Sequence, residues 1–351
     1  MNVIVFGGYG VFGSLVSKEL ARLGMHVTVA GRDSTRAAAF AASLGDGHRG
    51  IGADVTQPDA CRDALAGQSV AVSCAGPFDA LGQTLLDACL DRGVHYADIA
   101  DDRAYATLVR SYGERFADKG LTAAYGCSSL PGISGALALV AAEGRSEPPT
   151  RLRVTLFIGN DNPKGEAAVA SAVHLIGRSF PAPQGTLVGF RDPEVVELPQ
   201  PFGRRTVYNF ESPDYDLLPE LLSVPSVSVK VGFEMRLATA TFGMLARLST
   251  GYGKGTASVL NALGGAGRSL GGHSGGAVMS ELFFADGTTR RASVSSARDA
   301  QRMAALPCAL VANALGRAEV TVRGALTAFE ILGSKPLLEG LTSEGFELSL
   351  S

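Results

Sequence analysis

The 351-residue sequence predicts an α/β protein, with a doubly wound parallel sheet followed by an α+β domain built on a mainly antiparallel sheet. Two patterns lead to this prediction. Short apolar runs alternate with helical patterns from residue 1 to residue 147, which is typical of parallel strands joined by crossover helices. From residue 148 to residue 295, short strand-like runs follow one another with turn residues between them, which favours antiparallel pairing. Glu147-Pro148-Pro149 marks the boundary.

The first 33 residues carry the clearest local pattern. Asn2–Phe6 is a short apolar run rich in β-branched residues, as expected of a strand buried on both faces. Glycines follow at positions 8, 10 and 13, apolar residues then recur at helical spacing up to Leu23, and His26–Ala30 is a second strand. A Gly-x-Gly-x-x-Gly spacing between a strand and a helix predicts a Rossmann-type loop that binds a dinucleotide.

Each glycine of this loop has an expected role. Gly8 permits the turn, Gly10 lets the backbone approach a diphosphate, and Gly13 allows close packing of the helix on the strand. The start of the helix offers unpaired N–H groups and the positive end of its dipole to the phosphates. The remaining loop residues expected at the cofactor are Tyr9, Val11 and Phe12.

The end of the second strand indicates which dinucleotide is bound. NAD-specific sites usually place an acid there, whereas this chain has Gly31 followed by Arg32. A guanidinium suits a 2′-phosphate, so the sequence favours NADP(H) as the cofactor. Residues 34–36, Ser-Thr-Arg, offer further donors at the start of the next helix. Asp33 would repel the phosphate if it faced inward, and its alternative role is helix N-cap.

Two further strand ends lie on the expected cofactor edge of the sheet. Asp54 and Val55 follow the third strand, where Asp54 either meets the adenine or caps its own loop. The fourth strand ends at Cys74, and the break that follows brings backbone close to the nicotinamide ribose. Cys74 itself is more often a buried small hydrophobe than a nucleophile. The residues expected at this break are Cys74, Ala75, Gly76, Pro77 and Phe78.

The fifth strand, within residues 94–102, supplies the candidate catalytic residues Tyr96, Asp98 and Asp102. Three carboxylates within five residues repel one another, so at least one is expected to have a raised pKa, which suits proton transfer. The alternatives are that Asp101 and Asp102 cap the next helix and that Tyr96 packs in the core. No tyrosine has a lysine four residues later, which argues against short-chain dehydrogenase chemistry.

The composition excludes several other classes of function. With 46% hydrophobic and 19% charged residues and a net charge of −3, the chain has no basic footprint for nucleic acid. The five cysteines and five histidines lack metal-ligand spacing, so no metal is expected. The apolar run at the start is the first strand and not a leader, and residues 121–142 contain Pro131 and several glycines. We therefore expect a reduced, cytoplasmic protein without a membrane span.

The second domain is expected to contain short strands, two helices and a hairpin. Asp286-Gly287 predicts a type I′ turn between the hairpin strands. Its expected strands are residues 151–159, 186–190, 195–198 and 205–210, its expected helices are 164–177 and 233–248, and residues 251–276 are expected to form a Gly/Ser-rich loop. In the C-terminal segment, a helix is expected at residues 296–315 and a short strand at 319–323.

The order of motifs resembles that of a known family. GGYGVFG, GRD, ADV, CAGPF, GVHYADIADD and GCSSLPGISG follow one another as in the NADP-binding domain of saccharopine dehydrogenase-like (saccharopine reductase-like) oxidoreductases, over about the first 140 residues. Ala100-Asp101-Asp102 departs from the Gly-Glu of that family. The resemblance implies a second-domain sheet that contacts a small-molecule substrate, often a homodimer, and a C-terminal segment, residues 296–351, that packs back on the nucleotide domain.

Together these observations predict an NADP(H)-dependent oxidoreductase, most plausibly a reductase that passes hydride to a C=N, C=C or C=O bond of a small metabolite. The alternative is a catalytically inactive NADPH-binding sensor or interaction protein, which the altered acid motif and the incomplete catalytic set favour. Measured NADPH oxidation separates the two.

Overall fold

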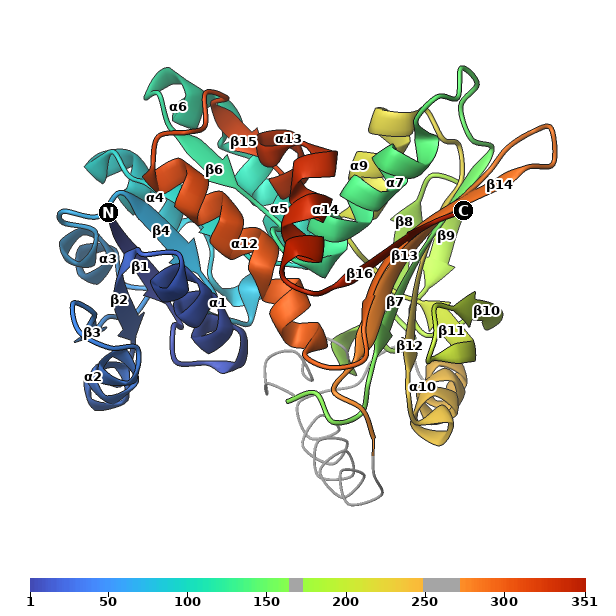
Figure 1. Ribbon diagram of the computed structural model, residues 1–351, viewed down its shortest axis with the longest axis horizontal. Helices are drawn as coiled ribbons and strands as arrows, with labels where there is room; N and C mark the ends of the chain where they lie inside the picture. The colour runs from blue at the N-terminus through green and yellow to red at the C-terminus, as the bar shows by residue number, and fades with distance from the viewer. Residues whose placement is uncertain (164–172, 249–271) are drawn as a thin grey trace. The chain divides into compact units, whose positions relative to one another are not determined.

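The computed structural model describes residues 1–163, 173–248 and 272–351, which form two compact units, each with its own large sheet (Figure 1). Unit 1 comprises Met1–Gly132 and Ala304–Gly340, and unit 2 comprises Ile133–Met303 and Leu341–Ser351. The division therefore falls at residue 132 and not at the predicted residue 147. Residues 133–147 belong to unit 2 because helix α7 (Ser134–Ala142) packs on its sheet, where Ser280 Oγ donates to Ser134 O at 2.9 Å.

Unit 1 is built on a seven-stranded, entirely parallel sheet in the order β15-β6-β5-β4-β1-β2-β3. This confirms the predicted doubly wound sheet. The order reverses between β1 and β4, which is where ligands bind in such sheets. The strands are β1 (Asn2–Phe6), β2 (His26–Gly31), β3 (Arg49–Gly52), β4 (Val70–Ser73), β5 (His95–Asp98), β6 (Thr122–Ala124) and β15 (Gly324–Leu326).

The helices of unit 1 follow the predicted pattern, and their ends have local causes. For example, one helix begins at Thr84, shortly after Gly82 with φ +58°, and ends at Gly93 with φ +66°. The helices are α1 (Val11–Arg22), α2 (Ser34–Ser43), α3 (Pro58–Ala64), α4 (Thr84–Arg92), α5 (Arg103–Ser111), α6 (Gly113–Asp118), α12 (Ala300–Gly316), α13 (Ala328–Leu332) and α14 (Ser334–Ser343), with short turns η1 (Phe78–Ala80) and η2 (Ser129–Ile133).

The C-terminal segment returns to this sheet. β15, drawn in red in Figure 1, pairs in parallel with β6, and Gly324 N donates to Leu121 O at 3.0 Å. The strand predicted at residues 319–323 is wrong. The carbonyl groups of Val320 and Val322 accept from the Arg323 guanidinium, and Val322 O also accepts from the Thr122 hydroxyl of β6 at 2.8 Å. These are side-chain bonds, and backbone pairing with β6 begins only at Gly324.

Unit 2 contains a seven-stranded sheet in the order β10-β11-β12-β7-β13-β14-β16. Among the described strands of this sheet only β7 and β12 pair in parallel, which confirms the predicted mainly antiparallel sheet. A two-stranded sheet, β8 with β9, accompanies it. The strands are β7 (Arg151–Ile158), β8 (Ser179–Ala182), β9 (Gly185–Val188), β10 (Glu194–Leu198), β11 (Gly203–Asn209), β12 (Val227–Phe233), β13 (Gly276–Phe283), β14 (Thr289–Ser296) and β16 (Glu347–Leu350).

The turn between β13 and β14 differs from the prediction. A type I′ turn needs a positive φ at both central residues, but only Gly287 has one, at +82°. Gly287 N donates to Phe284 O, and the Asp286 carboxylate accepts from the backbone and hydroxyl of Thr288. These side-chain bonds favour a right-handed Asp286, as in a three-residue hairpin loop that ends in a left-handed glycine.

Two helices complete the described part of unit 2, α9 (Asp214–Leu222) and α10 (Arg236–Leu248). α10 agrees with the helix predicted from residue 233. Most of the predicted helix 164–177 and the predicted loop 251–276 lie outside the described residues. Within residues 1–163, 173–248 and 272–351, no helix has both the length and the apolar character needed to cross a membrane.

Candidate cofactor site

The loop between β1 and α1 is turned by a glycine that precedes the predicted motif. Gly7 has φ +71°, its N–H donates to Ala30 O at 2.8 Å, and its carbonyl accepts from Gly10 N at 2.9 Å. Gly8, which was expected to make the turn, instead permits close packing. A Cβ there would lie 2.7 Å from Val5 O. The prediction that Gly8 makes the turn is wrong. Either glycine can adopt the positive φ of the turn, so the sequence does not distinguish Gly7 from Gly8.

The start of α1 is open to an anion. Gly10 is its N-cap and supplies no capping side chain, and the first turn contains no acidic residue. The helix begins close to the loop, since a Cβ on Gly13 would lie 2.1 Å from Gly7 O, in agreement with the predicted packing role. A Cβ on Gly10 would meet only Gly7 O, at 3.1 Å. The first-turn amides, at Val11, Phe12 and Gly13, therefore have the geometry that a diphosphate requires.

Tyr9 joins this loop to the end of β2. Its ring lies against Gly31, where a Cβ would be 2.4 Å from Tyr9 Cε1. Its hydroxyl accepts from Asp33 N at 3.1 Å, and the Arg36 guanidinium lies 4.8 Å from its ring centroid. The structure thus brings together four residues that the sequence placed at the cofactor or next to it.

The charges at the end of β2 fit a 2′-phosphate. Asp33 Oδ1 accepts from Arg36 N at 3.0 Å, which confirms its alternative role as the N-cap of α2. Its carboxylate is therefore hydrogen-bonded to the helix backbone. Arg32 is exposed. Asp54, close enough to feel the Arg32 charge, accepts from Thr56 N and Oγ1, and the Thr56 backbone bond is the main cause that lowers its pKa. Asp54 therefore caps its own loop, and its adenine contact stays a prediction.

The break after β4 lies directly beside the phosphate loop. A Cβ on Gly7 would lie 2.8 Å from both Ala75 N and Cys74 O, so the two loops are in van der Waals contact. Gly76 and Pro77 are exposed, as a ribose contact requires. Burial raises the pKa of the Cys74 thiol well above its ordinary range, which agrees with the interpretation of Cys74 as a small hydrophobe.

Two of the predicted catalytic residues are fully buried. Asp98 Oδ1 accepts from Gly126 N at 2.8 Å and Ala100 N at 2.9 Å, so the carboxylate ties the end of β5 to the end of β6. Burial raises the pKa of Asp98 to about 7, so the direction agrees with the prediction for this cluster, but the cause is burial and not repulsion between carboxylates. The Tyr96 and Tyr105 hydroxyls are hydrogen-bonded at 2.9 Å inside the core.

Asp102 is partly exposed and caps α5, since its Oδ1 accepts from Tyr105 N at 2.7 Å. The capping alternative is thus confirmed for this residue. Tyr105, which sequence reasoning missed, contacts Tyr96 through its hydroxyl and Phe78 through its ring, at a centroid distance of 5.3 Å. In the sequence, only the position of Tyr105 in the first turn after the N-cap Asp102 indicated that it lies near the end of β5.

Comparison with known proteins agrees with this geometry. Residues 3–124 match the family described as the saccharopine dehydrogenase NADP binding domain. The N-terminal part of the chain is thus similar to this NADP-binding domain. This match indicates an NADP(H)-binding domain. Within the described residues, the loop of Gly7, Gly10 and Gly13 and the exposed Arg32 fit that cofactor.

Two curated relatives match only the N-terminal part of the chain, whereas one solved structure matches the whole chain at low sequence identity. A trans-acting enoyl reductase of Mycobacterium tuberculosis is 28% identical over 138 residues, 37% of this chain and 33% of the relative. A human saccharopine dehydrogenase-like oxidoreductase is 24% identical over 156 residues, 39% of this chain and 36% of the relative. These matches cover about a third of the curated relatives' length. The structure of apo saccharopine dehydrogenase (L-Glu forming) from Saccharomyces cerevisiae matches with TM-score 0.67 at 12% identity, covering 100% of this chain and 99% of the other, so the fold is shared throughout.

Proposed function

We propose that the protein is an NADP(H)-dependent reductase that transfers hydride to a C=N, C=C or C=O bond of a small metabolite. The observation that carries this proposal is the open start of α1 beside the exposed Arg32, with Asp33 bonded to the α2 backbone. This combination supports binding of the phosphorylated dinucleotide, whose nicotinamide supplies the hydride when bound.

The chain's own residues supply binding and orientation. The amides of residues 11–13 hold the diphosphate, and Arg32 with the donors at the start of α2 holds the 2′-phosphate. The segment Cys74–Phe78 lies in contact with the phosphate loop and borders the nicotinamide ribose. Asp98 acts as a positioning residue, because its two backbone bonds fix the ends of β5 and β6 on the cofactor edge.

The proton that accompanies the hydride needs an accessible donor. Asp98 and Tyr96 have no exposed surface, so neither touches a substrate without a rearrangement of the core. Of the three predicted residues, Asp102 is the one with surface open to solvent, so Asp102 is the proposed proton donor.

Turnover is tested by following NADPH absorbance with purified protein and a panel of enoyl compounds, imines and 2-oxo acids. Enoyl compounds come first because a relative is named as an enoyl reductase. Oxidation of NADPH with one class supports the proposal. Tight NADPH binding by calorimetry without oxidation across the panel would support the alternative, an inactive NADPH-binding sensor. The expected homodimer stays a prediction, which sedimentation velocity tests.

A further inference from the structure

Unit 2 contains a cavity of about 180 Å³ between α10 and the segment that connects β9 to β10. Its apolar wall includes Phe190, Tyr208 and Met244, and the guanidinium-bearing residues Arg191 and Arg247 also line it. None of the described lining residues is acidic. The cavity therefore combines an apolar body with unbalanced positive charge.

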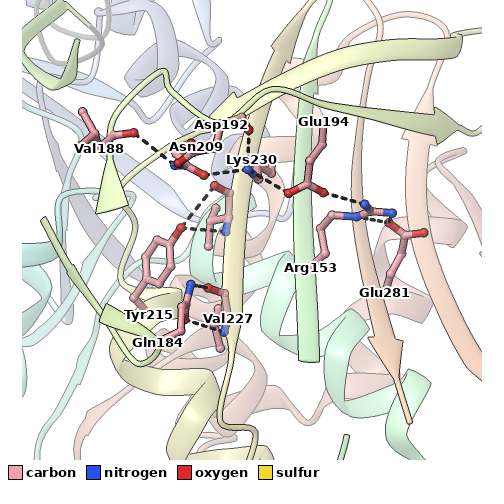
Figure 2. Close-up of polar contacts among 11 residues, drawn as sticks. Arg153, Gln184, Val188, Asp192, Glu194, Asn209, Tyr215, Val227, Lys230 and Glu281 are labelled. Carbon is pink, nitrogen blue, oxygen red and sulfur yellow. Dashed lines mark hydrogen bonds and ion pairs between the residues drawn. The ribbon is translucent and has the colours of Figure 1, made fainter. Parts of the chain in front are cut away.

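The positive charge is not neutralised by nearby carboxylates. Arg191 Nε donates to Ala246 O at 3.0 Å, and within the described parts of the chain Arg247 has no hydrogen bond or ion pair. The acids closest to Arg191 in sequence are engaged elsewhere. Asp192 accepts from Asn209 Nδ2 at 2.7 Å, and Glu194 is paired with Arg153 and Lys230 (Figure 2). An anion entering the cavity thus meets guanidinium groups with free N–H donors.

The backbone that presents Arg191 is held in an unfavourable conformation. Phe190 and Asp192, on either side of it, have φ +58° and +51°, a left-handed conformation that is unfavourable for residues other than glycine. Asn209 fixes the segment, because its carbonyl accepts from Phe190 N at 2.8 Å and its N–H donates to Arg191 O at 3.1 Å. Strain retained on both sides of Arg191 points to a function for the side chain that this segment presents.

A buried lysine secures the same segment. Lys230, which is 2% exposed, donates to Asp192 O at 2.8 Å and to Asn209 Oδ1 at 2.7 Å (Figure 2). Its ion pair with Glu194, 3.0 Å, continues to Arg153 and Glu281 across the sheet. This buried network links the core of unit 2 to the position of Arg191, so the arginine is pre-organised at the cavity.

The helix side of the cavity is shaped by a glycine. A Cβ on Gly243 would lie 2.5 Å from Tyr208 Cε1, so the Tyr208 ring packs against the backbone of α10. A glycine inside a helix is destabilising relative to alanine. Met244, the next residue, is 56% exposed. The absence of a side chain at Gly243 allows the Tyr208 ring to form one wall of the cavity.

From these features we infer that unit 2 binds a small organic carboxylate with an aromatic or branched apolar body. A dry cavity of about 150 Å³ accepts benzene, so this volume suits a body the size of benzoate. The guanidinium groups of Arg191 and Arg247 suit a carboxylate, and the tyrosine ring and the thioether of Met244 suit an apolar ring. The site is made entirely by unit 2, so it is tested without NADPH.

The test is a ligand-observed NMR titration of the full chain with sodium benzoate, benzyl alcohol and inorganic phosphate at constant ionic strength. Benzoate is expected to bind with a Kd of about 1 mM or tighter. Arg247→Ala and Arg191→Gln are each expected to weaken benzoate binding at least tenfold, because each removes a charge-assisted contact. Gly243→Ala is expected to weaken benzoate and benzyl alcohol alike by displacing Tyr208.

Arg204→Ala is the matched control, since it removes an exposed arginine from β11, the strand that carries Tyr208, and it should leave the titration unchanged. Thermal unfolding verifies that each variant folds. If Arg191→Gln does not fold, Arg247→Ala still tests the inference, because Arg247 is exposed. Equal binding of benzoate and benzyl alcohol, displacement of benzoate by equimolar phosphate, or full binding by Arg247→Ala would each overturn the inference.

Discussion

Gly7 and Gly13 meet so closely that a Cβ on Gly13 would lie 2.1 Å from the Gly7 carbonyl oxygen. The left-handed turn at Gly7 and the first turn of α1 therefore form one rigid element. Gly10, between them, has only one contact of 3.1 Å at its Cβ position. The two outer glycines are required by the protein itself, whereas Gly10 is left open towards the ligand.

Gly13→Ala and Gly10→Val should thus fail in different ways. Gly13→Ala forces α1 away from the loop and is expected to lower the free energy of unfolding by about 1–3 kcal/mol or more. Gly10→Val is expected to lose less stability than Gly13→Ala, since its Cβ meets Gly7 O at 3.1 Å and not 2.1 Å, and to lose NADPH binding, because its side chain occupies the place of the diphosphate. Urea unfolding and NADPH fluorescence titration measure the two effects. Unchanged NADPH affinity in Gly10→Val would place the diphosphate elsewhere.

Arg32→Ala should discriminate between the two coenzymes. Loss of a charge-assisted contact to the 2′-phosphate is expected to weaken NADPH binding by about 10- to 100-fold, with little effect on NADH. Arg92→Ala removes an exposed arginine at the end of α4 and serves as the control. Equal losses for NADPH and NADH, measured by calorimetry, would refute the assigned phosphate contact.

Asp98 should make stability depend on pH. Burial raises its pKa to about 7 from 3.8, so between about pH 4 and 7 the folded carboxyl keeps a proton that the unfolded chain releases. Its contribution to stability is therefore complete below pH 4, declines as the pH rises towards 7, and then stays constant, with a slope of at most about 1.4 kcal/mol per pH unit. Asp98→Asn should flatten this slope in urea unfolding at pH 5, 6 and 7. The exposed Asp46→Asn should not, and an identical slope in Asp98→Asn would show that Asp98 titrates normally.

Asp102 allows capping and proton donation to be separated. Asp102→Ala removes the bond to Tyr105 N and is expected to cost about 1 kcal/mol of stability, whereas Asp102→Asn retains a good N-cap. If Asp102 donates the proton, both variants lose turnover of the substrate found in the panel, although only the alanine variant loses stability. Full turnover by Asp102→Asn would rule the residue out as the donor.

Local sequence predicted most of unit 1. Most of its first six strands are short apolar runs next to helical patterns, although β3, Arg49–Gly52, is not apolar. The residues that decide these patterns are neighbours in the chain. The cap at Asp33 and the packing role of Gly13 were predicted for the same reason, because spacing over a few residues defines an N-cap and a phosphate loop.

Contacts between distant residues were decided only by the tertiary structure. The strand at residues 319–323 was predicted from alternation alone, yet pairing requires a partner, and β6 offers one only from Gly324 onward. Likewise, Asp98 was predicted as a candidate proton donor, because local sequence does not reveal that it is buried and that its carboxylate accepts from Gly126 N, 28 residues later.

The sequence by itself therefore determined the phosphate-binding loop, the nucleotide-binding fold of unit 1 and the cofactor, since these depend on short-range spacing of glycines, apolar residues and one arginine. Only the tertiary structure decided which carboxylates are buried and how Arg191 is presented beside α10. Burial and strain arise when remote segments pack together, and Lys230 and Asn209 hold Arg191 from strands that no local pattern connects to it.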